Sequence, residues 1–291
     1  MANTITLKRR IASIRNTRQI TKAMELVSSS KLRRAQTAAL ATRAYREAAS
    51  ALLARLSSVS EVERQPLFAT RPVRHRLYVV ITSSTGLAGA YNANVLKQLA
   101  SGIRRDQADK VKSSVITIGS KGAQFVRRLS GVELLAYYPS FGDEPTETQI
   151  QPILNTLVAG YTDAAVDEVV LIYTMFRSSI TQEAVSAQLL PAHLDAADGQ
   201  AANNSALMNF EPDVETVIHQ AGARLIQAQI WQALLESQAS EHAARAIAMK
   251  SATDNANDLI EDYTLEYNTA RQGAITQELA EISGGAEALN G

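Results

Sequence analysis

Apolar and small residues recur at three- and four-residue steps through the first part of the chain. The pattern comprises Leu7, Ile11, Ile14, Ile20, Met24, Val27, Leu32, Ala35, Ala39, Leu52 and Leu56. No proline or glycine interrupts residues 4–57. This spacing predicts one long amphipathic helix with Thr4 or Thr6 as its N-cap. At about 1.5 Å per residue the helix is on the order of 80 Å long, far more than a small domain needs to cover its own core.

The last part of the chain shows the same pattern more strongly. After Pro212 there is no further proline, and the apolar or small positions are Val214, Val217, Ala221, Leu225, Ala228, Trp231, Leu235, Ala239, His242, Ala246, Met249, Thr253, Ala256, Ile260, Tyr263, Tyr267, Ala270 and Ala274. A sustained alternation of three- and four-residue steps is typical of a coiled-coil seam. We therefore expect a helix from Asp213 to Ile282, ended by Gly284-Gly285.

The charge distribution indicates how these two helices are used. Residues 1–60 hold twelve Lys and Arg against two acids, whereas residues 211–291 hold four against thirteen, and the net charge of the whole chain is zero. Opposite charge at the two ends fits two tails with separate partners or two helices that lie side by side. A long helix with one apolar stripe needs a partner along its length, so we expect an antiparallel coiled coil. Exposed ion pairs contribute only about 0.2–1 kcal/mol each, so charge sets pairing and register more than stability.

The middle of the chain alternates strand-like and helix-like segments. Strands are predicted at residues 77–82, 115–118, 132–138, 169–173 and 180–190, with helices from about Ala93, up to Leu129 and from Glu147 to Tyr161. This order predicts a mostly parallel sheet with helices on both faces, and the last strand is expected to be antiparallel. The fold class is therefore α/β: a coiled coil of long terminal helices with an inserted α/β domain. The expected domains are residues 1–60, residues 61–206, which include a connector at 195–206, and residues 207–291.

Composition excludes several classes of protein. The chain is 46% hydrophobic and 20% charged, as in globular proteins, and no apolar run approaches the roughly 18 residues that cross a bilayer. There is no cysteine, which excludes disulfides, thiolate metal sites and thiol nucleophiles. The first twenty residues carry five basic side chains but no apolar block, so a secretory signal is not expected.

Two glycine-containing turns raise the question of a bound nucleotide or nucleic acid. The turn between Thr82 and Asn92 follows a strand but lacks both G-x-G-x-x-G and G-x-x-x-x-G-K-[ST]. Gly119-Ser120-Lys121-Gly122 matches the bare GXXG of an RNA-binding loop, yet it lies in a βα turn. The basic N-terminal helix contains only one aromatic residue, Tyr45, so a protein surface suits it better than nucleic acid.

Catalytic and metal-binding patterns are also missing from the sequence. The four histidines, His75, His193, His219 and His242, form no zinc or di-iron spacing. Asp254, Asp258 and Asp262 share one helical face, which fits a carboxylate site but better fits a solvated or partner-facing stripe. We expect no cofactor, no metal, no small-molecule substrate and no enzymatic activity of the chain's own.

Several long strings of residues resemble one protein family. Ile20-Thr21-Lys22-Ala23-Met24-Glu25-Leu26-Val27 with Ser30-Lys31-Leu32 resembles the N-terminal signature of the gamma subunit of F-type ATP synthases. Residues 236–245 and 249–256 are similar to its C-terminal signature, as are Tyr267 to Gln272 and Ile275 to Leu279. The resemblance covers the whole chain, including the order of its domains.

The resemblance implies a rotor. The helical pair would stand inside a ring of three alpha and three beta subunits, while the α/β domain and the epsilon subunit would sit on the membrane ring that proton flow turns. Nucleotide chemistry would occur in beta. By matching positions, Met24 and Arg245 would lie near an acidic loop of beta, and four residues would meet the head higher up: Arg271, Gln272, Thr276 and Glu278.

The sequence departs from the family pattern in the central turn. Where the family often has Asp-Arg and then Cys, this chain has Ser84, Thr85 and Ala88. A charge-dependent role of that turn is therefore not expected. The cysteine-bearing insert of the chloroplast form is missing, and the start at Met1 resembles a bacterial form, which implies a peripheral location on the cytoplasmic face of the cell membrane.

Overall fold

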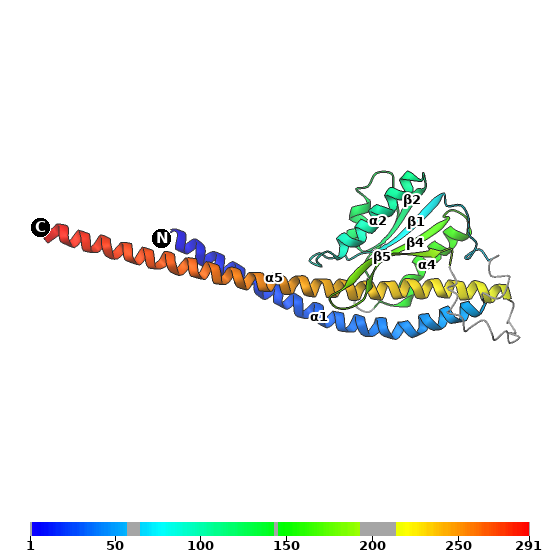
Figure 1. The fold of residues 1–291 in the computed structure, drawn as a ribbon, viewed down its shortest axis with the longest axis horizontal. Helices are drawn as coiled ribbons and strands as arrows, with labels where there is room; N and C mark the ends of the chain where they lie inside the picture. The colour runs from blue at the N-terminus through cyan, green and yellow to red at the C-terminus, as the bar shows by residue number, and fades with distance from the viewer. Residues whose placement is uncertain (1, 57–64, 143–144, 193–213, 291) are drawn as a thin grey trace. The chain divides into compact units, whose positions relative to one another are not determined.

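The computed structural model describes residues 2–56, 65–142, 145–192 and 214–290 (Figure 1). The elements in chain order are α1 (Ala2–Leu56), β1 (His75–Ile81), α2 (Tyr91–Ala108), β2 (Lys112–Ile118), α3 (Ser120–Val126), β3 (Glu133–Tyr138), α4 (Glu147–Thr162), β4 (Glu168–Phe176), β5 (Gln182–Leu190) and α5 (Val214–Asn290). The predicted limits between domains, at residues 60/61 and 206/207, lie outside the described residues.

The chain forms two compact units, and both long helices contribute to each of them. Met1–Ser28 and Arg245–Gly291 make up the first, which we call the two-helix unit. Ser29–Ala244 make up the second, which we call the α/β unit. The fold class expected from the sequence is confirmed: long N- and C-terminal helices pack together and a mostly parallel sheet lies between them in the sequence.

The sheet of the α/β unit has the strand order β3-β2-β1-β4-β5. β1 pairs in parallel with β2 and β4, and β2 pairs in parallel with β3. β5 is antiparallel to β4, as expected from the sequence. All five predicted strands exist, and each differs from its prediction by a few residues at most.

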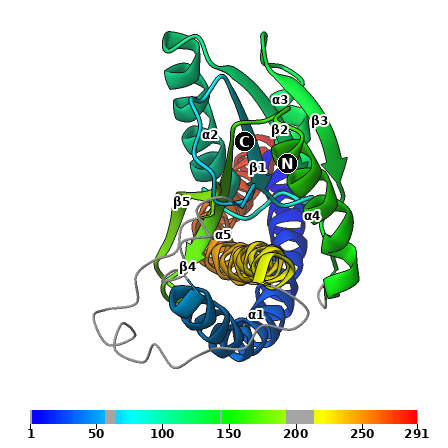
Figure 2. The same cartoon turned by 90° about the vertical axis from the view of Figure 1, so that its right-hand side faces the viewer.

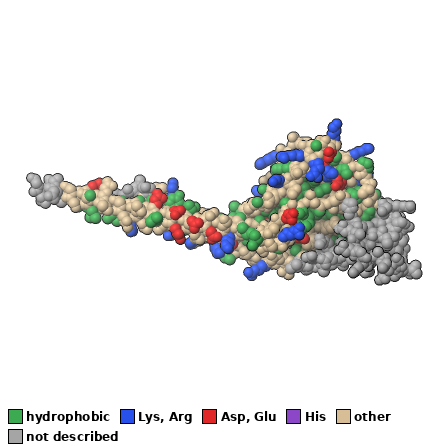
Figure 3. Space-filling view, in the orientation of Figure 1, with side chains coloured by type: hydrophobic (Ala, Val, Ile, Leu, Met, Phe, Trp, Pro, Cys, Tyr) green, Lys and Arg blue, Asp and Glu red, His purple; other side chains and the backbone are tan. Residues whose placement is uncertain are grey.

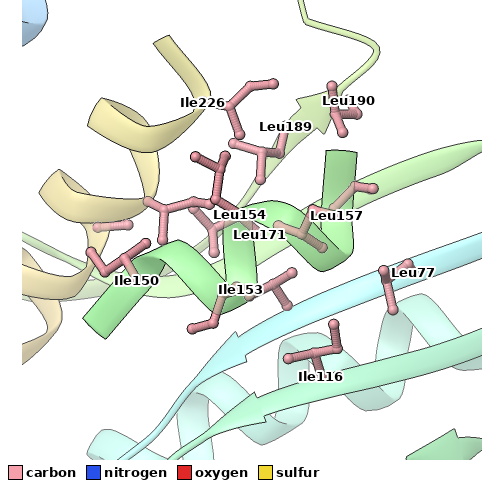
Figure 4. Packing of buried hydrophobic residues seen from close by; sticks show 14 of the residues in the cluster. Leu77, Ile116, Ile150, Ile153, Leu154, Leu157, Leu171, Leu189, Leu190 and Ile226 are labelled. Carbon is pink, nitrogen blue, oxygen red and sulfur yellow. The ribbon is translucent and has the colours of Figure 1, made fainter. Parts of the chain in front are cut away.

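Helices cover both faces of this sheet, with α2 and α4 on opposite sides (Figure 2). On one face α4 and α5 pack on alternate residues of β1, β2 and β4 in a single apolar cluster (Figure 4). Ile153 and Leu157 of α4 and Ile230 of α5 are fully buried there. On the other face Tyr78 and Val80 lie under α2 and α3. The period of two along each strand thus sends successive side chains to opposite layers.

Two predicted helix ends differ from the structure. α1 begins at Ala2, so Thr4 and Thr6 lie inside the helix and neither is its N-cap. α5 runs through Gly284-Gly285 to Asn290. A glycine inside a helix costs only about 1 kcal/mol, and the helix formers that follow, Ala286 to Leu289, continue the helix beyond the pair. A glycine pair alone was therefore too weak a signal for a stop.

Buried polar groups hold the amino ends of the strands. The carboxylate of Asp106 is fully buried, where it accepts hydrogen bonds from Tyr78 Oη and Ser113 Oγ, each at 2.8 Å, and pairs with Arg76. Burial raises the pKa of Tyr78, which keeps the phenol protonated as a donor. Burial alone would raise the pKa of Asp167 too, but two backbone N–H groups and Arg71 lower it below its usual value.

Candidate partner-binding surface

In the two-helix unit α1 and α5 run antiparallel in a fixed register. Thr253 Oγ1 donates to Thr21 Oγ1 at 2.8 Å, and Arg18 Nη1 donates to Asn257 Oδ1 at 3.2 Å. A third contact in the same register joins Arg10 of α1 to Tyr263 of α5: the guanidinium carbon of Arg10 lies 5.8 Å from the centre of the tyrosine ring. Residues closer to the N-terminus of α1 therefore lie opposite residues closer to the C-terminus of α5, as predicted for an antiparallel coiled coil.

The seam between these helices is formed mostly by small or polar side chains. Thr21 also donates its hydroxyl to the carbonyl of Arg18 at 3.0 Å, so both hydroxyls of the Thr21–Thr253 pair are satisfied. The buried residues among the described part of this unit are Leu7, Ile11, Thr21, Ser28, Arg245, Met249, Thr253 and Ala256. Small side chains such as those of Thr21, Ser28 and Ala256 let two helices approach closely, so the seam needs few large apolar groups.

Ten large apolar side chains among the described residues of the two-helix unit lie on its outer surface, whereas Leu7, Ile11 and Met249 are buried. Ile20 is 62% exposed and Leu265 is 71% exposed. We call this set the outer apolar surface, and it comprises Ile5, Ile20, Leu26, Val27, Ile247, Leu259, Leu265, Ile275, Leu279 and Ile282. Ile20 and Val27 are seven residues apart and share one side of α1, while Ile275, Leu279 and Ile282 form one stripe on α5.

This surface corrects part of the sequence prediction. The stripe predicted for α1 placed Ile20 and Val27 in the buried seam, yet both are exposed and the seam contains Thr21 and Ser28. Continuing the regular steps from Leu7 and Ile11 leads to Thr21 and Ser28 rather than to their apolar neighbours. The spacing therefore held the correct register, and hydrophobicity alone misassigned these two positions. In α5 the predicted seam is confirmed at Met249, Thr253 and Ala256.

The residues expected to contact partners differ in their exposure. Arg271, Gln272, Thr276 and Glu278 are exposed near the end of α5, where Thr276 Oγ1 donates to the carbonyl of Gln272 at 3.0 Å. Met24 is half-buried, and Arg245 is only 8% exposed. The register puts the level of Met24 opposite Lys250, so Arg245 lies about 7.5 Å further along the axis. The structure thus groups these residues at two separate levels of the helix pair.

Charged side chains are segregated on the same unit. Asp254, Asp258 and Asp262 are exposed, as are Glu261 and Glu266, and acidic side chains recur along α5 in Figure 3. The solvated or partner-facing interpretation of the aspartate stripe therefore fits the structure. Among the described residues no group of three or more acidic or histidine side chains is placed to hold a metal ion.

The central turn of the α/β unit is held by hydroxyl groups. Ser83 Oγ donates to the carbonyl of Thr85 at 2.6 Å, and Asn92 Nδ2 donates to Ser83 Oγ at 2.8 Å. Leu87 has a positive φ of 61° and is 61% exposed, whereas Ala88 is buried. A small residue beside a glycine in a turn after a strand is expected to be exposed, and for Ala88 that expectation is wrong: the chain turns at Leu87, which has a positive φ, and Ala88 is buried.

The GXXG turn has no backbone donor left for a phosphate. Gly119 N donates to Tyr138 O at 2.9 Å, Lys121 N to Ser83 O at 3.2 Å, Ser120 N to Ser84 Oγ at 3.3 Å and Gly122 N to Thr82 Oγ1 at 2.9 Å. Phosphate loops work through free N–H groups. A Cβ on Gly119 would lie 2.1 Å from the carbonyl oxygen of Thr82, so this glycine serves close packing of the two turns.

Within the described part of the chain no helix is both long and apolar enough to cross a membrane.

Comparison with known proteins gives consistent results along the whole chain. A family model described as ATP synthase matches residues 3–289. A protein of Stenotrophomonas maltophilia (strain R551-3) named ATP synthase gamma chain is 39% identical over 99% of this chain and 100% of its own length. The protein of the same name from Heliobacterium modesticaldum is 40% identical over 97% of this chain and 98% of its own.

Solved structures share the fold. A chain in the cryo-EM structure of the Euglena gracilis mitochondrial ATP synthase (OSCP/F1/c-ring, rotational state 3) superposes with a TM-score of 0.69 at 19% identity, over 99% of this chain and 95% of that one. A chain of the Tetrahymena thermophila enzyme, from its central stalk and c-ring, gives a TM-score of 0.64 at 23% identity, over 80% of this chain and 99% of that one.

Proposed function

The chain belongs to the ATP synthase gamma chain family, and we propose that it is the rotor that couples proton flow through a membrane ring to ATP synthesis and hydrolysis. It is a non-catalytic subunit of the central stalk. The two-helix unit would transmit the rotation to the catalytic subunits. Its asymmetric surface would drive the three catalytic beta subunits through different conformations in turn, and it would thereby regulate both ATPase activity and proton flow.

The outer apolar surface carries this proposal. Ile20, Val27 and Leu265 remain exposed although the unit has its own register and buried seam. Large exposed apolar groups on a soluble protein commonly mark a surface that a partner covers. A pair of helices with such groups on both α1 and α5 needs a partner that surrounds it, which a ring of subunits provides.

The proposed partners follow from the two units. The alpha and beta subunits would enclose the two-helix unit, and Met24 and Arg245 would face an acidic loop of beta. Arg271, Gln272, Thr276 and Glu278 would contact the head at the second level. The epsilon subunit and the membrane ring of c subunits would bind the α/β unit. The complex would be peripheral to the cytoplasmic face of a bacterial cell membrane.

Two other classes of function receive less support. A nucleotide-binding enzyme would need phosphate donors, but the N–H groups from Gly119 to Gly122 are all bonded within the protein. A nucleic-acid-binding protein would combine basic residues with stacking aromatic rings. The exposed basic residues Lys8, Arg9 and Arg15 of α1 share their unit with the acidic side of α5 instead.

Co-purification tests the assignment. A tagged copy expressed in cells should bring down alpha and beta subunits, while the isolated chain should hydrolyse no ATP. A double variant, Ile20→Ser with Val27→Ser, should keep its helix content but recover less of the head. Ser30→Ala, an exposed change on the same helix, is the matched control. ATP turnover by the pure chain, or full recovery of the head by the double variant, would contradict the proposal.

Rotation can be tested with an introduced thiol because the chain has no cysteine. Ile20 is a suitable position, because it is exposed on the two-helix unit that the head would enclose. A disulfide from Ile20→Cys to a cysteine on a facing subunit of the head should stop turnover, and reduction should restore it. A second disulfide between Thr21→Cys and Thr253→Cys should be harmless, because both helices turn together. Coupled turnover by fully crosslinked enzyme would contradict a rotor.

A further inference from the structure

Basic residues are concentrated in one part of the α/β unit. Residues 91–133, which include α2, β2 and α3, hold eight Lys and Arg and three acids, although this chain as a whole has no net charge. Figure 3 shows Lys and Arg side chains gathered over the α2 side of the unit. The excess is therefore a local property of one layer of the fold.

Five of these residues lie at the C-terminal ends of α2 and α3, on the way to the edge where β2 and β3 begin. Ile103 of α2 and Val126 of α3 are buried in the same apolar cluster, so both helices cover the same face of the sheet. Directly after them in the sequence come Arg104-Arg105 and Arg127-Arg128. Lys110 follows α2 and precedes β2. All five are exposed, and we call them the basic edge: Arg104, Arg105, Lys110, Arg127 and Arg128.

The acids of this segment neutralise little of the basic edge. Asp106 is buried and already bonded to Arg76, Tyr78 and Ser113. Glu133 pairs with Lys112 at 3.2 Å, and Lys112 is not a member of the edge. Asp109 is the remaining acid of residues 91–133. Basic residues do favour helix C-termini, but that interaction is confined to the last turn and does not account for five charges.

The character of the basic edge indicates its partner. Among the described residues of the α/β unit the large exposed apolar side chains are Leu87, Leu135, Tyr137 and Ile180, and none of them belongs to α2, to α3 or to the turn between α2 and β2. Leu87 and Ile180 follow the carboxyl ends of β1 and β4, at the opposite edge of the sheet. A packed protein interface has an apolar core, and single-stranded nucleic acid is held by aromatic rings. A cluster of four to eight basic residues without either is typical of a surface that meets anionic lipid headgroups.

We infer that the basic edge holds the α/β unit against the anionic phospholipid headgroups of the membrane. The inference rests on the proposed function, since a rotor bound to a membrane ring works close to that surface. The contact is electrostatic and needs no fixed lipid site, so it permits the unit to slide over the bilayer as it turns. It should weaken with rising ionic strength, because salt screens charges over about 10 Å.

Vesicle flotation of the full chain tests this inference. The chain should float with vesicles that contain phosphatidylglycerol and stay behind with vesicles of phosphatidylcholine alone. Each basic residue near an anionic surface changes binding about fivefold, so Arg104→Gln with Arg105→Gln and Arg128→Gln should lower the partition coefficient about a hundredfold. The matched control removes the same charge from the two-helix unit, by Lys8→Gln with Arg9→Gln and Arg15→Gln, and should change it far less.

The outcomes separate this inference from the proposed function. Equal losses in the two triple variants would overturn it, because binding would then depend on net charge alone. A normal melting temperature of the edge variant would support the inference, because it would exclude misfolding as the cause of lost binding. If the variant with Gln misfolds, a charge-preserving variant with Lys at the same three positions should retain binding. Weaker assembly of the edge variant with the membrane ring in lipid-free detergent would assign the edge to an acidic protein and overturn the lipid contact. Failure of the wild-type chain to recover alpha and beta subunits would instead count against the rotor.

Discussion

The two units of this protein differ in the share of their large apolar side chains that is buried. In the α/β unit Ile153 and Leu157 of α4 are 0% exposed, because they belong to the apolar cluster that α4 forms with the sheet. In the two-helix unit Ile20 and Leu265 are 62% and 71% exposed. Most of the large apolar residues of the first unit are already covered, with Leu87, Leu135, Tyr137 and Ile180 as the exposed exceptions among its described residues. The second unit has a seam that fixes the register of its two helices, but its outer apolar surface is exposed. Such a surface is expected of a protein segment that is enclosed by partner subunits.

Polar groups show the same contrast. In the α/β unit the buried carboxylate of Asp106 is bonded to Arg76, Tyr78 and Ser113 of the same unit. In the two-helix unit the buried hydroxyls of Thr21 and Thr253 join the helices, and Arg245 is the buried charged side chain among the described residues. A seam of small polar side chains gives a thin helix pair with specific register. Large apolar seams would have bound the helices more tightly but left less for a partner to contact.

The largest effect on stability is expected in the core of the α/β unit. Leu157→Ala should lower the free energy of unfolding by about 2–5 kcal/mol, since it leaves a cavity between α4 and the sheet. Leu265→Ala, the same change in the two-helix unit, should alter it by no more than about 0.5 kcal/mol. Urea denaturation followed by circular dichroism measures both. Similar losses in the two variants would mean that the outer apolar surface is packed within the chain.

The next effect concerns the continuity of α5. Ala248→Pro should cost about 3 kcal/mol, because proline removes a backbone donor and kinks a helix interior. Proton-driven ATP synthesis should be lost in membranes that contain this variant, while the α/β unit keeps its fold. Ala248→Ser is the control, since serine fits a helix at a small cost. Normal synthesis by the proline variant would show that the two-helix unit can bend without consequence.

Much of the fold could be predicted from the sequence because periodicity is a direct physical signal. The runs of β-branched residues near Val79, Ile116 and Leu171 gave the strands, since both faces of a parallel sheet are buried. The ends of the helices were harder to predict from the sequence. Thr4 is a favourable cap and Gly284 a favourable stop, but each is worth only about 1 kcal/mol, and neighbouring helix formers outweighed both.

The candidate surface was harder to predict than the core. A single apolar residue such as Ile20 carries no mark of whether it faces a seam or a partner, and hydrophobicity assigned it to the seam. Register decided the matter, because Thr21 meets Thr253 and turns Ile20 outward. The residues at the end of α5 came from family resemblance, and their contacts remain predictions, since they depend on other chains.

A smaller effect is expected from the hydroxyl pair in the seam. Thr253→Val should lower the stability of the two-helix unit by about 1 kcal/mol, because Thr21 loses the hydrogen bond that it accepts. Replacing both residues by valine should cost less than the two single changes together, since no buried hydroxyl then lacks its partner across the seam. Hydrogen exchange of the backbone amides of α5 around Thr253 measures this local stability. Additive losses would show that the two hydroxyls contribute independently.

The smallest effect on folding, and the sharpest on function, is expected at the end of α5. Arg271 and Gln272 are exposed, so Arg271→Ala with Gln272→Ala removes no buried contact of the chain itself. Alanine is also a better helix former than either, and the free energy of unfolding should stay within about 0.5 kcal/mol. The rate of ATP turnover or its coupling to proton flow should nevertheless fall, because the proposed contact with the head is lost.

The exposed pair at Gln277 and Glu281 provides the control for that variant. Gln277 Nε2 donates to Glu281 Oε1 at 3.0 Å within the same helix, so its replacement by alanine shortens an exposed side chain close by and removes only a bond within α5. If the surface acts through defined contacts, the variant at Arg271 and Gln272 should lose coupling while Gln277→Ala keeps it. Equal losses would indicate that any change near the end of α5 disturbs the head. A large loss of helix content in the variant at Arg271 and Gln272 would instead show that these residues stabilise α5. They would then not belong to a surface that serves only to contact partners.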